Sequence, residues 1–393
     1  MLLAAMLLAA VNLRTAVTSV GPVLDEVSTG VGLSGGTAGL LTTLPVLSFA
    51  LLGSLTPRLA RRYAERRVLC ASLLLMAAGL LARSLVSAAA PFLLLSVVAL
   101  AGGAMGNVLL PVLVKRHFPD RIGPLTAAYT TALAVGLTAS AALTVPLAAL
   151  RGGPGEWRLG LGVWALPAAV AAAAWLGLAR HDRPVPAEQH PARPAVHRSG
   201  TAWALALFFG AQSMQAYITF GWFALFFRER GGFSPTTAGL LVAVVAAVAV
   251  PVSAVVPAYA ARFGDQRPVL VVLVGCYAAA YTGMLLAPRS GALLWVLLAG
   301  VAGGTFPLAL VMIGLRTRTV AATASLSAFA QSAGYLVAGC GPLLVGVLHG
   351  ATGGWGWPFV LIFADLGLLA VSGWYAAQPR FVEDDLAAEV RVT

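Results

Sequence analysis

The sequence predicts an all-α membrane protein with twelve transmembrane helices in two pseudo-symmetric six-helix bundles. Of its 393 residues, 59% are apolar and only 10% are charged, and the mean hydropathy is +0.88. A soluble domain carries about 25% charged residues, so this much apolar surface does not fit one water-soluble core. The composition therefore excludes a cytosolic enzyme, a secreted module and a disordered chain.

Twelve apolar segments are long enough to cross a hydrocarbon core of about 30 Å, which takes roughly 20 helical residues. Segments containing Pro, Gly or charge separate them. The spans of the first half are 2–24, 37–57, 68–87, 91–114, 123–149 and 159–179. Those of the second half are 201–227, 236–260, 268–287, 291–314, 320–348 and 358–376. The proline-containing polar stretch 180–200 predicts a cytoplasmic linker between the bundles 1–179 and 201–378, and 379–393 form a cytoplasmic tail.

The basic residues set the expected orientation. The chain has 25 Lys and Arg against 14 Asp and Glu, a net charge of +11. With the N-terminus inside, most of these cations fall on the cytoplasmic side, as the positive-inside rule requires. A smaller group, which includes Arg83, falls on the outer side. We expect a multi-pass protein of the bacterial plasma (inner) membrane with both termini cytoplasmic, surrounded by the lipid bilayer and without a nucleic-acid partner.

The two halves repeat one another. The segment 37–41, TAGLL, returns at 237–241. Gly102-Gly103 returns as Gly303-Gly304, and Lys115 has its counterpart in Arg316 at nearly the same offset. A repeat across the halves of a twelve-span chain is typical of a secondary transporter, whose substrate site lies near the membrane midplane between the repeats.

Two ionisable residues lie deep in the predicted spans, Arg14 in the first and Asp365 in the twelfth. A charge inside the membrane costs several kcal/mol on insertion scales, so each is a candidate functional residue. The guanidinium of Arg14 offers a fork of donors that suits a small planar anion; the alternative is a structural arginine bound to backbone carbonyls. For Asp365 a structural hydrogen bond is favoured, and a coupling proton is left open as a further partner.

Polar residues also form stripes on several spans. Asn12 and its neighbours on the first span match a stripe on the seventh that consists of Gln212, Gln215, Thr219 and Trp222. Such stripes either face a central cavity or make interhelical hydrogen bonds. In a regular helix Arg14 points roughly 130° away from the stripe of Asn12, so both face the cavity only if the helix is distorted. Further candidates, equally open to packing or binding, are Asn107, Tyr129, Gln331 and Tyr335.

No pattern points to covalent chemistry. Cys70, Cys276 and Cys340 lie within apolar runs and match no metal-ligand spacing. The histidines lie at span ends or in the linker, and no nucleophile and base occur together. We expect no enzymatic activity, no cofactor and no metal site.

Several motifs are shared with one family. They are Asn12-Leu13-Arg14 with 19–22, 106–111 running to 114–116, Tyr129-Thr130, Trp164 to Pro167, and 330–335 with Gly341-Pro342. On these motifs the chain resembles the major facilitator superfamily (MFS) and, within it, the cyanate/nitroimidazole transporter (CynX/NimT) family. The resemblance implies the MFS fold, a monomer, two bundles that rock between inward-open and outward-open states, and a cavity lined by helices one, four, seven and ten. The superfamily's loop after the second span is degenerate here at 57–67, with arginine for its aspartate and alanine for its glycine.

We therefore expect a secondary transporter that moves a small anion or nitro-heterocyclic solute, cyanate- or nitroimidazole-like, across the plasma membrane by alternating access. The expected substrate-binding residues are Arg14, Asn12, Asn107, Tyr129, Gln212, Gln215, Trp222, Gln331 and Tyr335. The alternative is an MFS drug or metabolite efflux pump, for which an acidic residue in the cavity would be expected.

Overall fold

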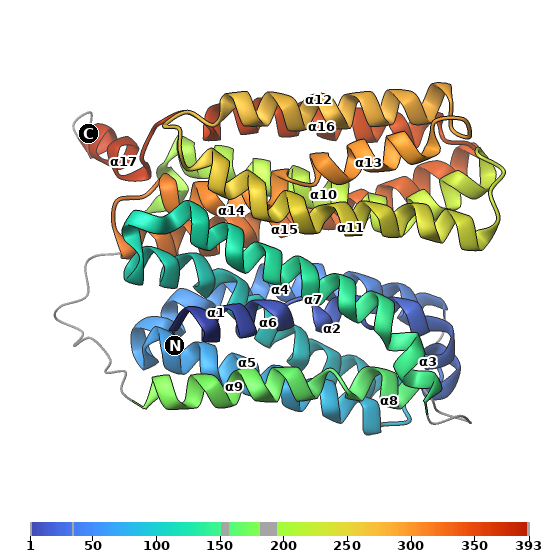
Figure 1. Ribbon diagram of the computed structural model, residues 1–393, viewed down its shortest axis with the longest axis horizontal. Helices are drawn as coiled ribbons and strands as arrows, with labels where there is room; N and C mark the ends of the chain where they lie inside the picture. Colours follow the sequence, from blue (N-terminus) through green and yellow to red (C-terminus); the bar gives the residue numbers. More distant parts are fainter. Residues whose placement is uncertain (1, 34, 151–156, 181–194, 391–393) are drawn as a thin grey trace. The chain divides into compact units, whose positions relative to one another are not determined.

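The computed structural model describes residues 2–33, 35–150, 157–180 and 195–390, which form helices without any strand among them (Figure 1). The chain divides into two compact units. Unit 1 comprises Met1–Leu113 and Ala132–Ala192, and unit 2 comprises Val114–Thr131 and Arg193–Thr393. Most of the predicted linker 180–200 lies outside the described residues, so the predicted domain boundaries stay a prediction.

All twelve predicted spans coincide with a helix or with a run of shorter helices. The first half forms α1 (Leu2–Asn12), α2 (Thr15–Thr18), η1 (Gly21–Val23), α3 (Leu24–Val31), α4 (Gly35–Tyr63), α5 (Glu65–Leu85), α6 (Ala89–His117), η2 (Pro119–Arg121), α7 (Ile122–Ala149), α8 (Trp157–Gly162) and α9 (Ala165–Ala179). The second half forms η4 (Val196–Arg198), α10 (Gly200–Glu229), α11 (Pro235–Ala260), α12 (Arg267–Leu286), α13 (Ala292–Ala302), α14 (Thr305–Leu315), α15 (Val320–Thr352), α16 (Gly356–Ala376) and α17 (Val382–Val390). Among the described residues, ten helical segments are long and apolar enough to cross a membrane. The helices α4 and α10 occupy the second and seventh predicted spans, which completes the twelve-helix architecture.

Proline explains two of the interrupted spans. Pro167 and Pro307 lie in the first turn of α9 and α14, and neither has an N–H to donate to the carbonyl four residues earlier. The carbonyls of Val163 and Gly303 instead accept from the residue before each proline, at 3.0 Å and 3.1 Å. The tighter turn separates α8 from α9 and α13 from α14. The repeat-related Gly102-Gly103 has no such proline after it, and α6 continues through it.

Small residues allow close helix packing in both units. In unit 1, a Cβ on Gly136 of α7 would lie 1.8 Å from the Val11 carbonyl oxygen of α1. In unit 2, a Cβ on Gly210 of α10 would lie 2.9 Å from the carbonyl oxygen of Gly334 on α15, and one on Gly334 would lie 2.9 Å from the nitrogen of Gly210. Helices in membranes associate through such contacts because lipid is as apolar as their side chains.

The tail contains a helix that sequence analysis did not predict. The carboxylates of α17 bind the N-terminal ends of two long helices of unit 2. Asp385 accepts from the Ser199 hydroxyl at 2.6 Å and from the Thr201 N–H at 2.9 Å, at the start of α10. Glu383 accepts from the N–H groups of Arg318 and Thr319 at 2.9 Å and 3.0 Å, at the start of α15. Negative charge at a helix N-terminus complements its unsatisfied N–H groups and its dipole.

Candidate functional site

The first span is interrupted between α1 and α2, at Leu13 and Arg14. The Asn12 amide nitrogen donates to the Leu8 carbonyl at 2.7 Å and to the Pro167 carbonyl of α9 at 3.2 Å. The Thr15 hydroxyl donates to the Asn12 carbonyl at 2.8 Å. These side chains compete with the backbone for carbonyls that a regular helix would pair internally. The first span is therefore distorted in the way that Arg14 and Asn12 would need in order to face one cavity. That both side chains face a cavity stays a prediction.

Arg14 lies at the break itself, as the residue that precedes the first turn of α2. Its guanidinium carbon is 5.2 Å from the centroid of the Phe49 ring on α4, and its side chain is half-buried. A cation over an aromatic face gains electrostatic attraction without losing its charge. The arrangement holds a positive charge on an irregular segment of a membrane-spanning region.

Arg83, which the charge distribution places among the cations of the outer side near the end of the predicted span 68–87, is a buried cation. It lies within α5 and is fully buried in unit 1. Its terminal nitrogens donate to the Ala16 carbonyl at 3.1 Å and to the Ser19 hydroxyl at 3.0 Å. Because α2 ends at Thr18, the Ala16 carbonyl lies next to a helix terminus and is a strong acceptor for this cation. Arg83 therefore anchors the segment that follows Arg14, a role that its position near the end of a predicted span did not reveal.

A pocket of about 290 Å³ opens beside Asn12 in unit 1. Its walls are almost entirely aliphatic. They are formed by Leu8, Val11, Asn12, Leu166, Pro167 and Val170. Arg14 is not among them, so this pocket lacks the charge that an anion site needs.

The stripe on α10 makes hydrogen bonds within unit 2. The Gln212 amide donates to the Phe209 carbonyl at 2.9 Å and to the Ser213 hydroxyl at 2.6 Å. The Trp222 indole donates to the Pro342 carbonyl of α15 at 3.1 Å. Both residues thus make the kind of hydrogen bond within the helix bundle that was one of the two interpretations of the stripe. A role of Gln212 and Trp222 in binding substrate stays a prediction.

Gln215 connects three helices. Its amide nitrogen donates to the Ile362 carbonyl of α16 at 3.1 Å, and its oxygen accepts from the Tyr281 hydroxyl of α12 at 2.7 Å. The side chain is fully buried. Gln215 therefore holds α10, α12 and α16 together.

The remaining predicted site residues are buried as well. On α15, Gln331 donates to the Ser327 hydroxyl at 2.9 Å, and the Tyr335 ring packs edge-on against Phe209 with centroids 5.1 Å apart. Asn107 is buried in α6 within unit 1, and Tyr129 is buried in the part of α7 that belongs to unit 2.

The repeat-related cations Lys115 and Arg316 act alike. The Lys115 amine donates to the carbonyls of Gly314 and Thr317, at 3.2 Å and 2.7 Å, where α14 ends. Arg316 donates to the carbonyls of Ala376 and Ala377, at 2.9 Å and 2.6 Å, where α16 ends. Each cation neutralises the negative end of a helix dipole.

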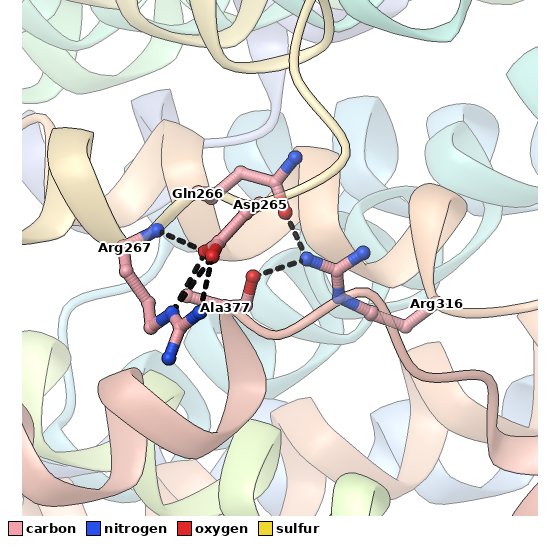
Figure 2. A network of polar contacts seen from close by, with 5 residues as sticks. All are labelled: Asp265, Gln266, Arg267, Arg316 and Ala377. Atoms are coloured by element: carbon pink, nitrogen blue, oxygen red, sulfur yellow. Dashed lines mark hydrogen bonds and ion pairs between the residues drawn. The ribbon is translucent and has the colours of Figure 1, made fainter.

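Figure 2 shows how Arg316 joins a polar network on the loop between α11 and α12. Arg316 also donates to the Gln266 side-chain oxygen. Asp265 accepts from the Arg267 backbone N–H at 2.9 Å and from its guanidinium at 2.5–3.0 Å. Hydrogen bonds from Arg267 hold the pKa of Asp265 below its usual range. The loop between α11 and α12 thus holds a charged network in which Asp265 pairs with Arg267.

Comparison with known proteins identifies the fold and its relatives. The family model of the Major Facilitator Superfamily matches residues 6–301. The chain is 35% identical to the 2-nitroimidazole transporter of Escherichia coli (strain K12), over 96% of each chain. It is 31% identical to the cyanate transport protein CynX of the same organism, over 90% of this chain and 91% of that one. The proton:xylose symporter XylE bound to 6-bromo-6-deoxy-D-glucose has the same fold, with a TM-score of 0.77 over 98% of each chain at 14% identity.

A twelve-helix chain with this repeat and this fold is a membrane transporter. The protein belongs to the major facilitator superfamily and, within it, to the family of the cyanate and nitroimidazole transporters. The predicted family, fold class and multi-pass membrane character are confirmed.

Proposed function

We propose that the protein is a secondary transporter that moves a small anion or a nitro-heterocyclic solute, cyanate- or nitroimidazole-like, across the bacterial plasma membrane by alternating access. The names of its relatives, a 2-nitroimidazole transporter and a cyanate transport protein, support this class of solute. The positive-inside distribution of its cations supports cytoplasmic termini. In this proposal one chain is the working unit.

The observation that carries the proposal is Arg14 at the break of the first span. Irregular backbone at membrane depth is tolerated where it lines a cavity or is buried in protein, and interrupted helices are where transporters bind their solutes. A guanidinium there supplies a permanent positive charge and planar donors that match cyanate or a nitro group. Its contact with Phe49 orients the group without neutralising it.

The other proposed contacts are hydrogen-bonding and stacking groups. In unit 1 they are Asn12 and Asn107. In unit 2 they are Tyr129, Gln212, Gln215, Trp222, Gln331 and Tyr335, and Gln215 also fixes α10 against α12 and α16.

Ligand-induced thermal stabilisation of detergent-purified protein tests the proposal. The panel holds cyanate, nitrate, bicarbonate, 2-nitroimidazole and several cationic drugs, each applied to wild type, Arg14→Ala and the matched control Arg262→Ala, which removes an exposed arginine. A solute that binds only the native state at 100 times its Kd stabilises the protein by about 2.7 kcal/mol. We expect a shift with one small anion or with 2-nitroimidazole that persists in Arg262→Ala and is lost in Arg14→Ala.

Two results would overturn the proposal. A shift with cationic drugs that survives Arg14→Ala favours the efflux-pump alternative. A shift with an anion that also survives Arg14→Ala removes Arg14 from the site. Circular dichroism of Arg14→Ala establishes that the variant has kept its helices before either result is interpreted.

A further inference from the structure

Asp365 lies in the middle of α16, inside the last membrane span of unit 2. Its side chain is only 5% exposed. Neither carboxyl oxygen accepts a hydrogen bond of normal geometry from any described residue. The ion pairs found among the described residues, which join Arg267 to Asp265, Arg318 to Asp384 and His349 to Glu229, do not include it.

The helices packed against α16 are α10, α12 and α15. From α10, the Gln215 side chain interacts with the Asp365 carboxyl. From α12, Tyr277 and Tyr281 interact with it electrostatically, and their rings stack with centroids 5.3 Å apart. None of these three neighbours is a cation.

The hydrogen bonds of Gln215 fix the polar group that faces the carboxyl. Its oxygen accepts from Tyr281 at 2.7 Å, and one of its N–H groups donates to the carbonyl of Ile362, one turn before Asp365, at 3.1 Å. An amide nitrogen has two N–H donors, so the second is available to the carboxyl. Asp365 therefore lies in a small fixed polar cluster within an apolar bundle.

An ionised carboxylate at this position would be a desolvated anion with one neutral donor and, within the described part of the chain, no counter-ion. Removing an isolated carboxylate from water costs far more than one hydrogen bond returns, so such groups bind a proton instead. Tyrosine loses its proton only near pH 10 in water. Within the cluster, Asp365 is thus the group whose charge changes under physiological conditions.

We propose that Asp365 is a proton-binding site of the transport cycle, with Gln215 and Tyr281 as its positioning residues. A carboxyl oxygen forms an O–H bond with a proton taken from water on one side of the membrane. That bond breaks when the proton passes to water on the other side, so the carboxyl returns to its starting state. Coupling this exchange to solute movement rests on the proposed function, whereas proton binding does not.

Infrared difference spectroscopy of purified protein without solute tests proton binding alone. The variant Asp365→Asn keeps the shape of the neutral acid, and the matched control Asp384→Asn removes an exposed carboxylate of α17. We expect wild type at neutral pH to show the C=O stretch of a protonated carboxylic acid, which Asp365→Asn lacks and Asp384→Asn retains. The same band in Asp365→Asn would overturn the assignment.

Proteoliposomes test the coupling with 2-nitroimidazole as the probe. If one proton accompanies each solute, a difference of one pH unit supports about tenfold accumulation. We expect Asp365→Asn to retain solute counterflow at equal pH but to lose accumulation driven by a pH gradient of either sign, and Asp365→Glu to restore it. Gradient-driven accumulation by Asp365→Asn at the wild-type level would overturn the coupling.

The two experiments separate the proton site from the proposed function. If wild type shows no counterflow of any anion or nitro-heterocycle, the proposed function fails while the infrared band still decides whether Asp365 holds a proton. If Asp365→Asn does not fold, Tyr281→Phe decides instead. Loss of the gradient-driven component in Tyr281→Phe, which removes the hydroxyl that donates to Gln215, with counterflow kept, supports the cluster, and unchanged accumulation contradicts it.

Discussion

Replacing Ala64 by glycine should stabilise the protein, although glycine usually weakens a helical chain. Ala64 joins α4 to α5 with φ 68° and ψ 150°, and among the described residues it is the one non-glycine with positive φ. A residue held in a region that only glycine populates costs about 1–3 kcal/mol. Against this, glycine loses about 0.5–1 kcal/mol more backbone entropy, and the buried methyl group is worth about 0.8 kcal/mol. The net gain is on the order of 0.5 kcal/mol.

The matched control is Ala60→Gly, in the last turns of α4, where glycine costs about 1 kcal/mol. The two variants should therefore differ by about 1.5 kcal/mol, roughly a tenfold difference in the folding equilibrium. Equilibrium denaturation in mixed micelles measures this difference. If Ala64→Gly is as destabilising as Ala60→Gly, the backbone at Ala64 is not strained and the reasoning is wrong.

Two further outcomes follow from packing and charge. Gly136→Ala should reduce the yield of monodisperse protein in size-exclusion chromatography, because its Cβ would meet the Val11 carbonyl oxygen at 1.8 Å. The control Gly367→Ala, whose Cβ would have no atom within 4 Å, should instead stabilise α16 by about 1 kcal/mol. Equal yields of the two variants would contradict the close packing at Gly136. Hydrogen bonds from Arg318 hold the pKa of Asp384 below its usual range. The pair's contribution to the free energy of unfolding is therefore present above about pH 4 and is lost as the pH falls further. Asp384→Asn should flatten the decline of the melting midpoint between about pH 5 and pH 3, and parallel curves for variant and wild type would show that the pair contributes nothing.

The spans could be predicted from sequence because the membrane imposes their length and composition. Breaks at Pro167 and Pro307 follow from local chemistry, since a proline removes one donor at a known distance along the chain. The sequence indicates the break at Arg14 only indirectly, because a regular helix could not turn both Arg14 and Asn12 toward one cavity. The break depends on Asn12 and Thr15 competing for carbonyls, and part of that competition is a contact with Pro167 of a distant helix.

Tertiary partners could not be predicted in the same way. Arg83 lies near the outer end of a predicted span, and only the fold brings Ala16 and Ser19 to its guanidinium. The helical spacing placed Gln215 on a polar stripe but could not show that Tyr281 and Ile362 take its amide. The helix α17 could not be predicted from hydropathy because it begins with an acidic run, although acidic residues fit a helix N-terminus.

Solute counterflow in proteoliposomes tests the central claim, that this protein carries a small anion or nitro-heterocycle by means of Arg14. Vesicles loaded with unlabelled cyanate or 2-nitroimidazole are diluted into trace labelled solute, with wild type, Arg14→Ala and Arg262→Ala compared at equal protein density. We predict transient accumulation of at least one of these solutes by wild type and by Arg262→Ala, and none by Arg14→Ala. Accumulation of cationic drugs alone, or of either solute by Arg14→Ala at the wild-type rate, would contradict the claim.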